Sequence, residues 1–106
     1  MPTEQDVRRI ALGLPKVTEA PHFDRTAFRA RIIFATIGGG TANLKLLPEQ
    51  AVMLIEAEPG TFRALGGWTR QGFVGVDLAR IDDDRLEMLI RDAWRIAAPK
   101  GAELPD

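Results

Sequence analysis

An apolar stripe near the C-terminus constrains the fold of this chain more than any other feature. Asp82 is suited to cap the start of a helix, the acidic run 82–84 matches the positive end of a helix dipole, and Pro99 ends the segment. A stripe this wide has to be buried against a second layer of secondary structure. Its members recur three and four positions apart, on one helix face: Leu86, Leu89, Ile90, Ala93, Trp94 and Ala97.

The second layer is predicted from segments with period-two alternation. Residues 28–35 divide into two alternating sets of side chains, which predicts one strand. The triglycine at 38–40 allows a tight turn, and residues 41–46 alternate again, so the two segments are predicted to form a hairpin. A further strand is predicted over residues 73–78, entered from the glycine-containing loop 66–72.

Two more helices are predicted, over residues 3–14 and from Pro48 to residue 58. Thr3 and Asp6 have the spacing of a helix start signal, and proline is tolerated in a first helical turn. With 106 residues, the chain is long enough for one core but too short for two. We therefore predict one domain over residues 1–106, of the two-layer α+β class, with an antiparallel sheet of about five strands packed against three helices.

Residue types that are absent restrict the possible chemistry. The chain has no cysteine, serine or tyrosine, and His22 is its one histidine, so we expect no enzyme, disulfide or cofactor. Apolar residues make up 45% of the chain, and no window reaches the roughly 18 to 20 apolar residues of a membrane span. Charges interrupt the N-terminal apolar residues, unlike in a signal peptide, so we expect a cytoplasmic protein with no membrane contact. We also expect a monomer.

Charges are distributed unevenly along the chain, although the net charge is only −1. Segments 25–47 and 61–76 contain no acidic residue. Three interpretations stay open: solvated strand residues that protect an edge, a face that binds phosphates, or a face that binds an acidic protein. The basic residues of these segments are Arg25, Arg29, Arg31, Lys45, Arg63 and Arg70.

Aromatic residues accompany some of these cations. Trp68 and Phe73 bracket Arg70, which is typical of a platform on which bases stack. Trp68 is equally compatible with a lid over the sheet edge, its indole N–H bonded to a carbonyl. His22, within "APHFDR", fits a packed turn residue or a contributor to a binding surface.

Two familiar ligand motifs are rejected. The triglycine lacks the lysine and the serine or threonine of a phosphate-binding loop. The acidic run 82–84 lacks the spacing and the closing glutamate of a calcium loop. Capping and the helix dipole account for these carboxylates, so we expect no metal site.

Several stretches resemble the MmcQ/YjbR family in order: "IALGLPKVTEAPHFDRTAFR" (10–29), "IFAT" (33–36), "NLKL" (43–46), "GGWTRQGFVGVDLA" (66–79) and "APK" (98–100). The resemblance implies a frataxin-like α+β fold and DNA binding through a double wing of β-hairpins. Frataxins bind iron on an acidic ridge of a helix. In the first predicted helix here, Glu4 and Asp6 are accompanied by Arg8 and Arg9, so the resemblance is not taken to imply iron binding.

We therefore expect a non-enzymatic DNA-binding domain that uses a basic sheet face and hairpin loops. The alternative is a module for a protein or a small anion, with no role in nucleic-acid binding. Arg25, Arg29, Lys45 and Arg70 are expected on one surface opposite the helices. The residues predicted to bind the nucleic acid or anion are His22, Arg25, Arg29, Arg31, Lys45, Trp68, Arg70 and Phe73.

Overall fold

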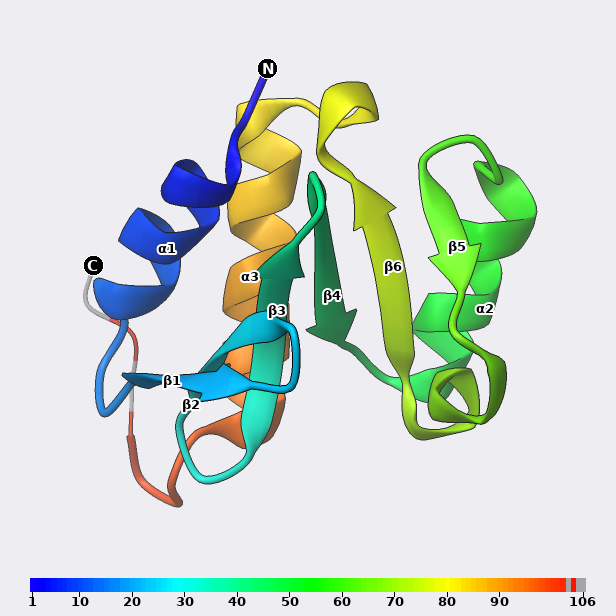
Figure 1. Cartoon of the computed structure of the whole chain (residues 1–106). Helices are drawn as coiled ribbons and strands as arrows, with labels where there is room; N and C mark the ends of the chain where they lie inside the picture. Colours follow the sequence, from blue (N-terminus) through cyan, green and yellow to red (C-terminus); the bar gives the residue numbers. More distant parts are fainter. Residues whose placement is uncertain (103, 105–106) are drawn as a thin grey trace.

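The computed structural model describes residues 1–102 and 104. Over this part of the chain, six strands form one antiparallel sheet in the order β1-β2-β3-β4-β6-β5 (Figure 1). The strands are β1 (Thr18–His22), β2 (Arg25–Arg29), β3 (Ile33–Gly38), β4 (Thr41–Lys45), β5 (Phe62–Ala64) and β6 (Phe73–Asp77). The helices are α1 (Glu4–Leu12), α2 (Pro48–Ala57) and α3 (Asp83–Ala97), with two 3-10 helices, η1 (Gly66–Gln71) and η2 (Leu78–Arg80).

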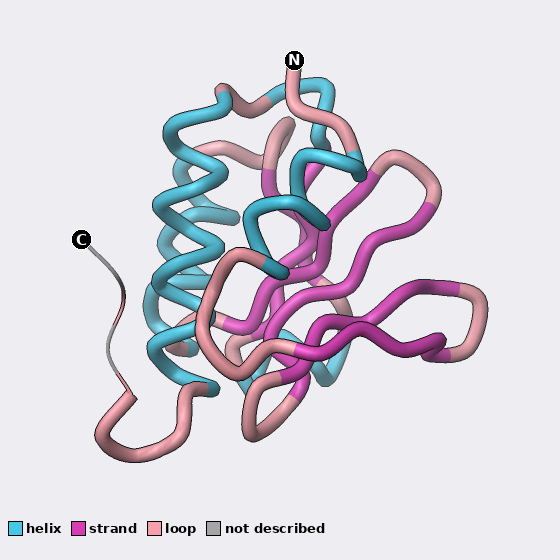
Figure 2. Tube along the Cα trace, turned by 90° about the vertical axis from the view of Figure 1, so that its left-hand side faces the viewer, coloured by secondary structure: helices cyan, strands magenta, loops and turns pink. Residues whose placement is uncertain are grey.

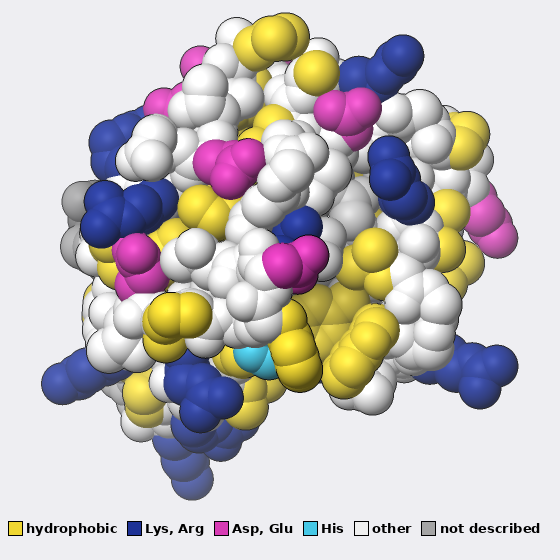
Figure 3. All heavy atoms as spheres, in the orientation of Figure 1, with side chains coloured by type: hydrophobic (Ala, Val, Ile, Leu, Met, Phe, Trp, Pro, Cys, Tyr) yellow, Lys and Arg dark blue, Asp and Glu magenta, His cyan; other side chains and the backbone are white. Residues whose placement is uncertain are grey.

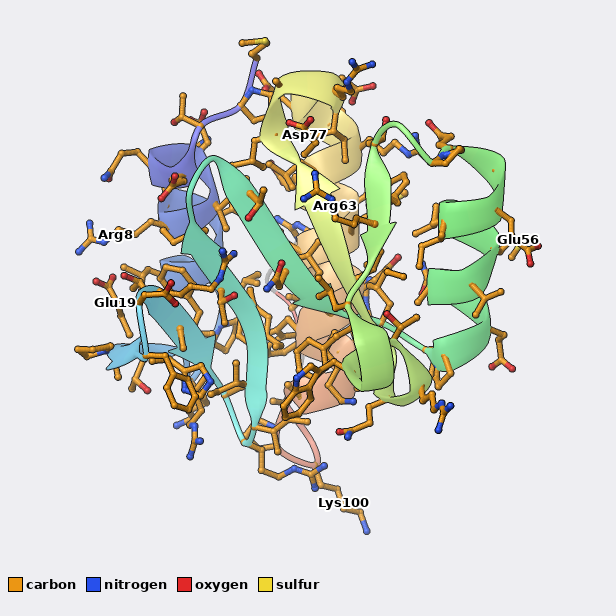
Figure 4. The ribbon with its side chains drawn as sticks, turned by 45° about the vertical axis from the view of Figure 1, so that its right-hand side comes forward. Arg8, Glu19, Glu56, Arg63, Asp77 and Lys100 are labelled. Atoms are coloured by element: carbon orange, nitrogen blue, oxygen red, sulfur yellow. The ribbon has the colours of Figure 1, made fainter. Side chains whose placement is uncertain are left out.

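The α-helices form a layer on one side of the sheet, as Figure 2 shows. α1 and α3 pack against β3, and α2 lies against β5 and β6. Arg85 of α3 forms a bidentate ion pair with Glu58, which follows α2. Arg8 of α1 and Glu19 of β1 point toward each other and pair at 2.7 Å (Figure 4). This two-layer α+β arrangement confirms the predicted fold class.

The core lies between the helices and one face of the sheet. The strand register aligns two apolar rows on that face: Phe28, Ala35, Leu44 and Val74, and next to them Ile37, Ala42, Val76 and Phe62. All are buried, as are the six members of the α3 stripe. Because the helices pack against this face, the opposite face of the sheet has no helix layer over it.

The helix start signals are confirmed. Thr3 and Asp6 form a capping box at α1, and the Asp82 carboxylate accepts a hydrogen bond from the Arg85 backbone at the start of α3. Pro48 occupies the first turn of α2. No helix among residues 1–102 and 104 has the length and apolar character needed to span a membrane.

The prediction of a single strand over residues 28–35 is wrong. The chain turns at residues 30–32, so this segment supplies the end of β2 and the start of β3, with a bulge between Phe28 and Arg29. The Ala30 backbone N–H donates to the Ile32 carbonyl at 3.1 Å, and the Arg31 N–H donates to the Ala97 carbonyl at 2.9 Å. Alternation continues through this turn without glycine or proline, which hides it in the sequence.

The sheet also has more strands than the five predicted. β1 is an edge strand with four of its five residues exposed, and it contains Pro21. β5 has only three residues. Neither produces an alternating apolar pattern, because an exposed edge strand or a three-residue strand has too few buried positions to show one.

We expect Trp94→Ala to lower the free energy of unfolding by about 3–5 kcal/mol, because it removes a large buried aromatic side chain. Trp94 is 1% exposed, and its indole N–H donates to the Pro15 carbonyl at 2.9 Å. Urea denaturation would measure the change. Met88→Ala, at an exposed position of the same helix, is the control and should change stability by less than about 0.5 kcal/mol. Equal effects of the two substitutions would contradict the assigned core.

Candidate functional site

A groove of about 650 Å³ lies on the sheet face opposite the helices. Thr36 of β3 and Asn43 of β4 contribute to its floor, the β1–β2 turn forms one wall, and η1 forms the other. In Figure 1 this turn lies in front of β3, and η1 lies at the lower end of β6. Figure 3 shows a hollow in the same region, with hydrophobic side chains on both of its sides next to the cyan histidine.

Small side chains account for the depth of the groove. The register places Ala27, Thr36, Asn43 and Gly75 in one row across β2, β3, β4 and β6. A Cβ at Gly75 would lie 3.2 Å from a methyl carbon of Leu65, which itself lines the groove. The row is therefore a low floor between two taller walls.

Arg25 spans three strands beneath this groove. Its Nε donates to the Thr36 hydroxyl at 2.8 Å, and its two Nη atoms donate to the Thr36 and Gly38 carbonyls and to the hydroxyl and carbonyl of Thr41, at 3.0 to 3.3 Å. These contacts match the five N–H donors of a guanidinium. A phosphate contact by Arg25, as the sequence predicts, would have to displace internal bonds, so the residue acts first as a structural connection.

The Arg25 charge is not neutralised by an ion pair. Within residues 1–102 and 104, no carboxylate lies within 4.0 Å of its guanidinium. Burial lowers the pKa of Arg25, while the carboxylates of Asp24 and Glu4 act in the opposite direction. An arginine stays protonated in proteins. Arg25 thus gives the groove a fixed positive charge.

η1 forms the wall that carries Trp68. Leu65, Trp68 and Gln71 line the groove, and they are three positions apart, so they lie on one side of a 3-10 helix. Gly72 closes this helix with φ +99, and a Cβ there would lie 1.8 Å from the Leu46 carbonyl oxygen. Glycine is therefore required where η1 meets the end of β4.

Trp68 is exposed rather than a buried lid. Trp68 is 62% exposed. Its ring and the Phe73 ring meet edge-on, with their centroids 6.0 Å apart. Its indole N–H has no acceptor in the described part of the chain, contrary to the lid interpretation. Lys45 lies 5.1 Å from the Phe73 ring centroid and donates to the Gln71 carbonyl at 2.6 Å.

The β1–β2 turn forms the opposite wall and contains a residue that sequence reasoning missed. Phe23 follows His22 and has φ +58, with 93% of its surface exposed. The rings of His22 and Phe23 meet edge-on, 4.7 Å apart. Recognising the two-residue turn between "PH" and "RT" would have pointed to Phe23. Asp24, Thr36 and Asn43 also line the groove and were not predicted.

Six of the eight predicted site residues line this groove, and two do not. Arg31 lies in the β2–β3 turn and Arg70 on η1, and both are exposed outside the lining. The predicted convergence of four cations is therefore incomplete: Arg25, Arg29 and Lys45 come together, and Arg70 does not. Arg70 directly precedes Gln71 in the 3-10 helix η1, so it points away from the side that Trp68 and Gln71 share. The six that line it are His22, Arg25, Arg29, Lys45, Trp68 and Phe73, and their role in binding stays a prediction.

The groove has more positive than negative side chains. Three cations, Arg25, Arg29 and Lys45, line it together with one carboxylate, Asp24. In the portion of the chain that the structure describes, no group of three or more histidine, cysteine or acidic side chains could hold a metal ion. The groove therefore combines aromatic side chains with positive charge.

Comparisons with known proteins identify a family and a fold. The family model described as YjbR matches residues 12–96. A crystal structure of the Deinococcus radiodurans protein DR2400, with the domain DUF419, has a TM-score of 0.81 and 23% sequence identity to this chain. The match covers 97% of this chain and 83% of that one, and at this identity it shows a shared fold. No curated protein matches the chain.

We expect Arg25→Gln to lower the free energy of unfolding by about 2–4 kcal/mol, because several partly buried hydrogen bonds are lost together. Arg29→Gln is the matched control on the same strand. Arg29 is exposed and has no hydrogen-bonded partner among the described residues, so its substitution should cost less than about 0.5 kcal/mol. Urea midpoints measure both, and an unchanged midpoint for Arg25→Gln would contradict the structural role.

Proposed function

This chain belongs to the YjbR family, and from that premise we propose that it is a non-enzymatic DNA-binding domain whose ligand is single-stranded DNA. One observation carries the proposal: exposed aromatic rings and three cations line the same groove. Bases stack on aromatic side chains whatever the sequence, and cations nearby attract the phosphates.

The shape of the groove favours a single strand over a duplex. A duplex keeps the faces of its bases stacked inside, whereas an unpaired base can enter a hollow and present its face to Trp68. Tight duplex binding is expected of a strongly basic domain, and this chain has a net charge of −1. Its positive charge is instead local, at Arg25, Arg29 and Lys45.

The residues that line the groove support binding rather than catalysis. The chain has no cysteine or serine to serve as a nucleophile. His22 has no hydrogen-bonded carboxylate among residues 1–102 and 104 that would orient it as a base, and its ring contacts Phe23 instead. The alternative ligands are an acidic peptide or a small anion, which the cations would attract without any need for the aromatic rings.

We expect Arg29→Gln to weaken binding of an oligothymidylate of about ten nucleotides. It should also flatten the slope of log affinity against log salt by about 0.7, the value for one phosphate on a single strand. Fluorescence anisotropy at several salt concentrations measures both effects. Arg95→Gln is the control, because Arg95 lies on α3 away from the groove and pairs with Asp92.

The same titration includes a duplex of equal length and an acidic peptide. If the oligothymidylate fails to bind below about 0.1 mM at low salt, a weak limit even for non-specific binding, the proposal is wrong. Stronger binding of the acidic peptide than of the oligothymidylate would favour the protein-binding alternative. Equal effects of Arg29→Gln and Arg95→Gln would show that binding occurs outside the groove.

A further inference from the structure

We propose that Phe23 and Trp68 are the two sides of a clamp that holds one unpaired base between their rings, above a floor where Asn43 contacts the edge of the base. The inference rests on the proposed function and deepens it, because it assigns the site to single bases rather than to the phosphate backbone alone. The two residues line one groove from opposite walls, the β1–β2 turn and η1.

Phe23 presents its ring from the two-residue turn between β1 and β2, a hairpin turn of the kind that takes a positive φ at its first residue. Its backbone has φ +58, a left-handed conformation that bulky side chains rarely adopt. Its ring is not buried, since the residue is 93% exposed. The rings of His22 and Phe23 are 4.7 Å apart between centroids and inclined at 70°, and the high exposure of Phe23 leaves its ring accessible to a ligand.

Trp68 is held in place from behind while its ring stays exposed. Phe73 meets it edge-on, with the two rings 86° apart. η1 itself is fixed by Gly72, whose N–H donates to the Thr69 carbonyl and whose carbonyl accepts from the Leu46 N–H at 2.9 Å. The two aromatic residues therefore project from a β-turn and from a 3-10 helix whose end is anchored to the sheet, with a hollow between the two walls (Figure 3).

The floor offers hydrogen bonds to a base edge. Asn43 lines the groove and is half-buried, and its amide has no partner in the described portion of the chain. An asparagine side chain presents one donor and one acceptor side by side, which suits the paired donor and acceptor of a base edge. Thr36 accepts a hydrogen bond from Arg25, so its own hydroxyl hydrogen is available for a further acceptor.

The cations are placed for the phosphates that flank such a base. Lys45 gives one hydrogen bond to the Gln71 carbonyl, and an ammonium group has three donors, so two stay available. Arg29 is exposed at the groove. The stacked base would then account for affinity that does not depend on salt, while Lys45 and Arg29 would account for the part that does.

Tryptophan fluorescence separates this inference from the proposed function. The chain has two tryptophans, and Trp94 is buried, so a ligand in the groove changes the emission of Trp68. The full chain is titrated with thymidine and adenosine monophosphates, and acrylamide quenching reports the accessibility of Trp68. We expect the nucleotides to change the emission and to protect Trp68, and Trp68→Phe to remove the signal.

A second titration, by anisotropy, compares a short oligothymidylate with the same strand carrying one central abasic position. Loss of one stacked base should weaken binding by about 5- to 150-fold at unchanged charge. Phe23→Ala should reduce affinity for the intact strand by a similar factor and leave the melting temperature unchanged, because the ring is exposed. Met53→Ala, at an exposed apolar position of α2, is the control and should bind like the unmodified protein.

The outcomes distinguish the two proposals. If the oligothymidylate binds but the abasic strand binds equally well and Trp68 emission does not change, the clamp is wrong and the proposed function stands. If mononucleotides protect Trp68 but no strand binds, the clamp holds for free nucleotides and the proposed function is wrong. If neither nucleotides nor strands have any effect, both are overturned.

Discussion

Burial of the α3 stripe against one face of the sheet is the constraint on which the rest of this structure depends. Trp94 and the apolar residues of α3 pack under β3 and β4, and the core is complete without any side chain from the opposite face. That face is therefore free to carry small, polar and charged residues at no loss to the core. The groove is possible because the fold takes its stability from one side of the sheet only.

The free face still needs internal order, and Arg25 provides it. A row of small residues such as Ala27 and Gly75 leaves little contact between neighbouring side chains. Arg25 replaces that contact with hydrogen bonds that connect β2 to β3 and β4. Gly38 leaves room for it, since a Cβ there would lie 3.1 Å from the Arg25 side chain. One residue thus supplies both cohesion and positive potential to the groove.

Much of the fold could be predicted from the sequence, and the groove only in part. The stripe on α3, the caps at Thr3 and Asp82 and the hairpin at the triglycine each have a strong local signal, because side-chain spacing follows backbone geometry directly. The turn at residues 30–32 and the 3-10 helix η1 have none. Phe23 was missed for a related reason: sequence patterns report buried positions, and an exposed residue in a turn leaves no such pattern. The sequence placed Lys45, Trp68 and Arg70 in one candidate site. Because residues three apart share a side of the 3-10 helix η1, Trp68 and Gln71 line the groove and Arg70 does not.

The close approach at Gly72 has a consequence for how this protein tolerates sequence change. The end of η1, the helix that carries Trp68, is fixed by a backbone contact between Gly72 and Leu46, neither of which lines the groove. A substitution at Gly72 would move the whole wall while leaving each groove residue intact. In a library of random variants, we therefore expect substitutions of single groove residues to leave the backbone of the wall in place, and substitutions of Gly72 to displace it. The wall that carries Trp68 can therefore vary in its side chains, whereas its backbone at Gly72 cannot accept a side chain without moving.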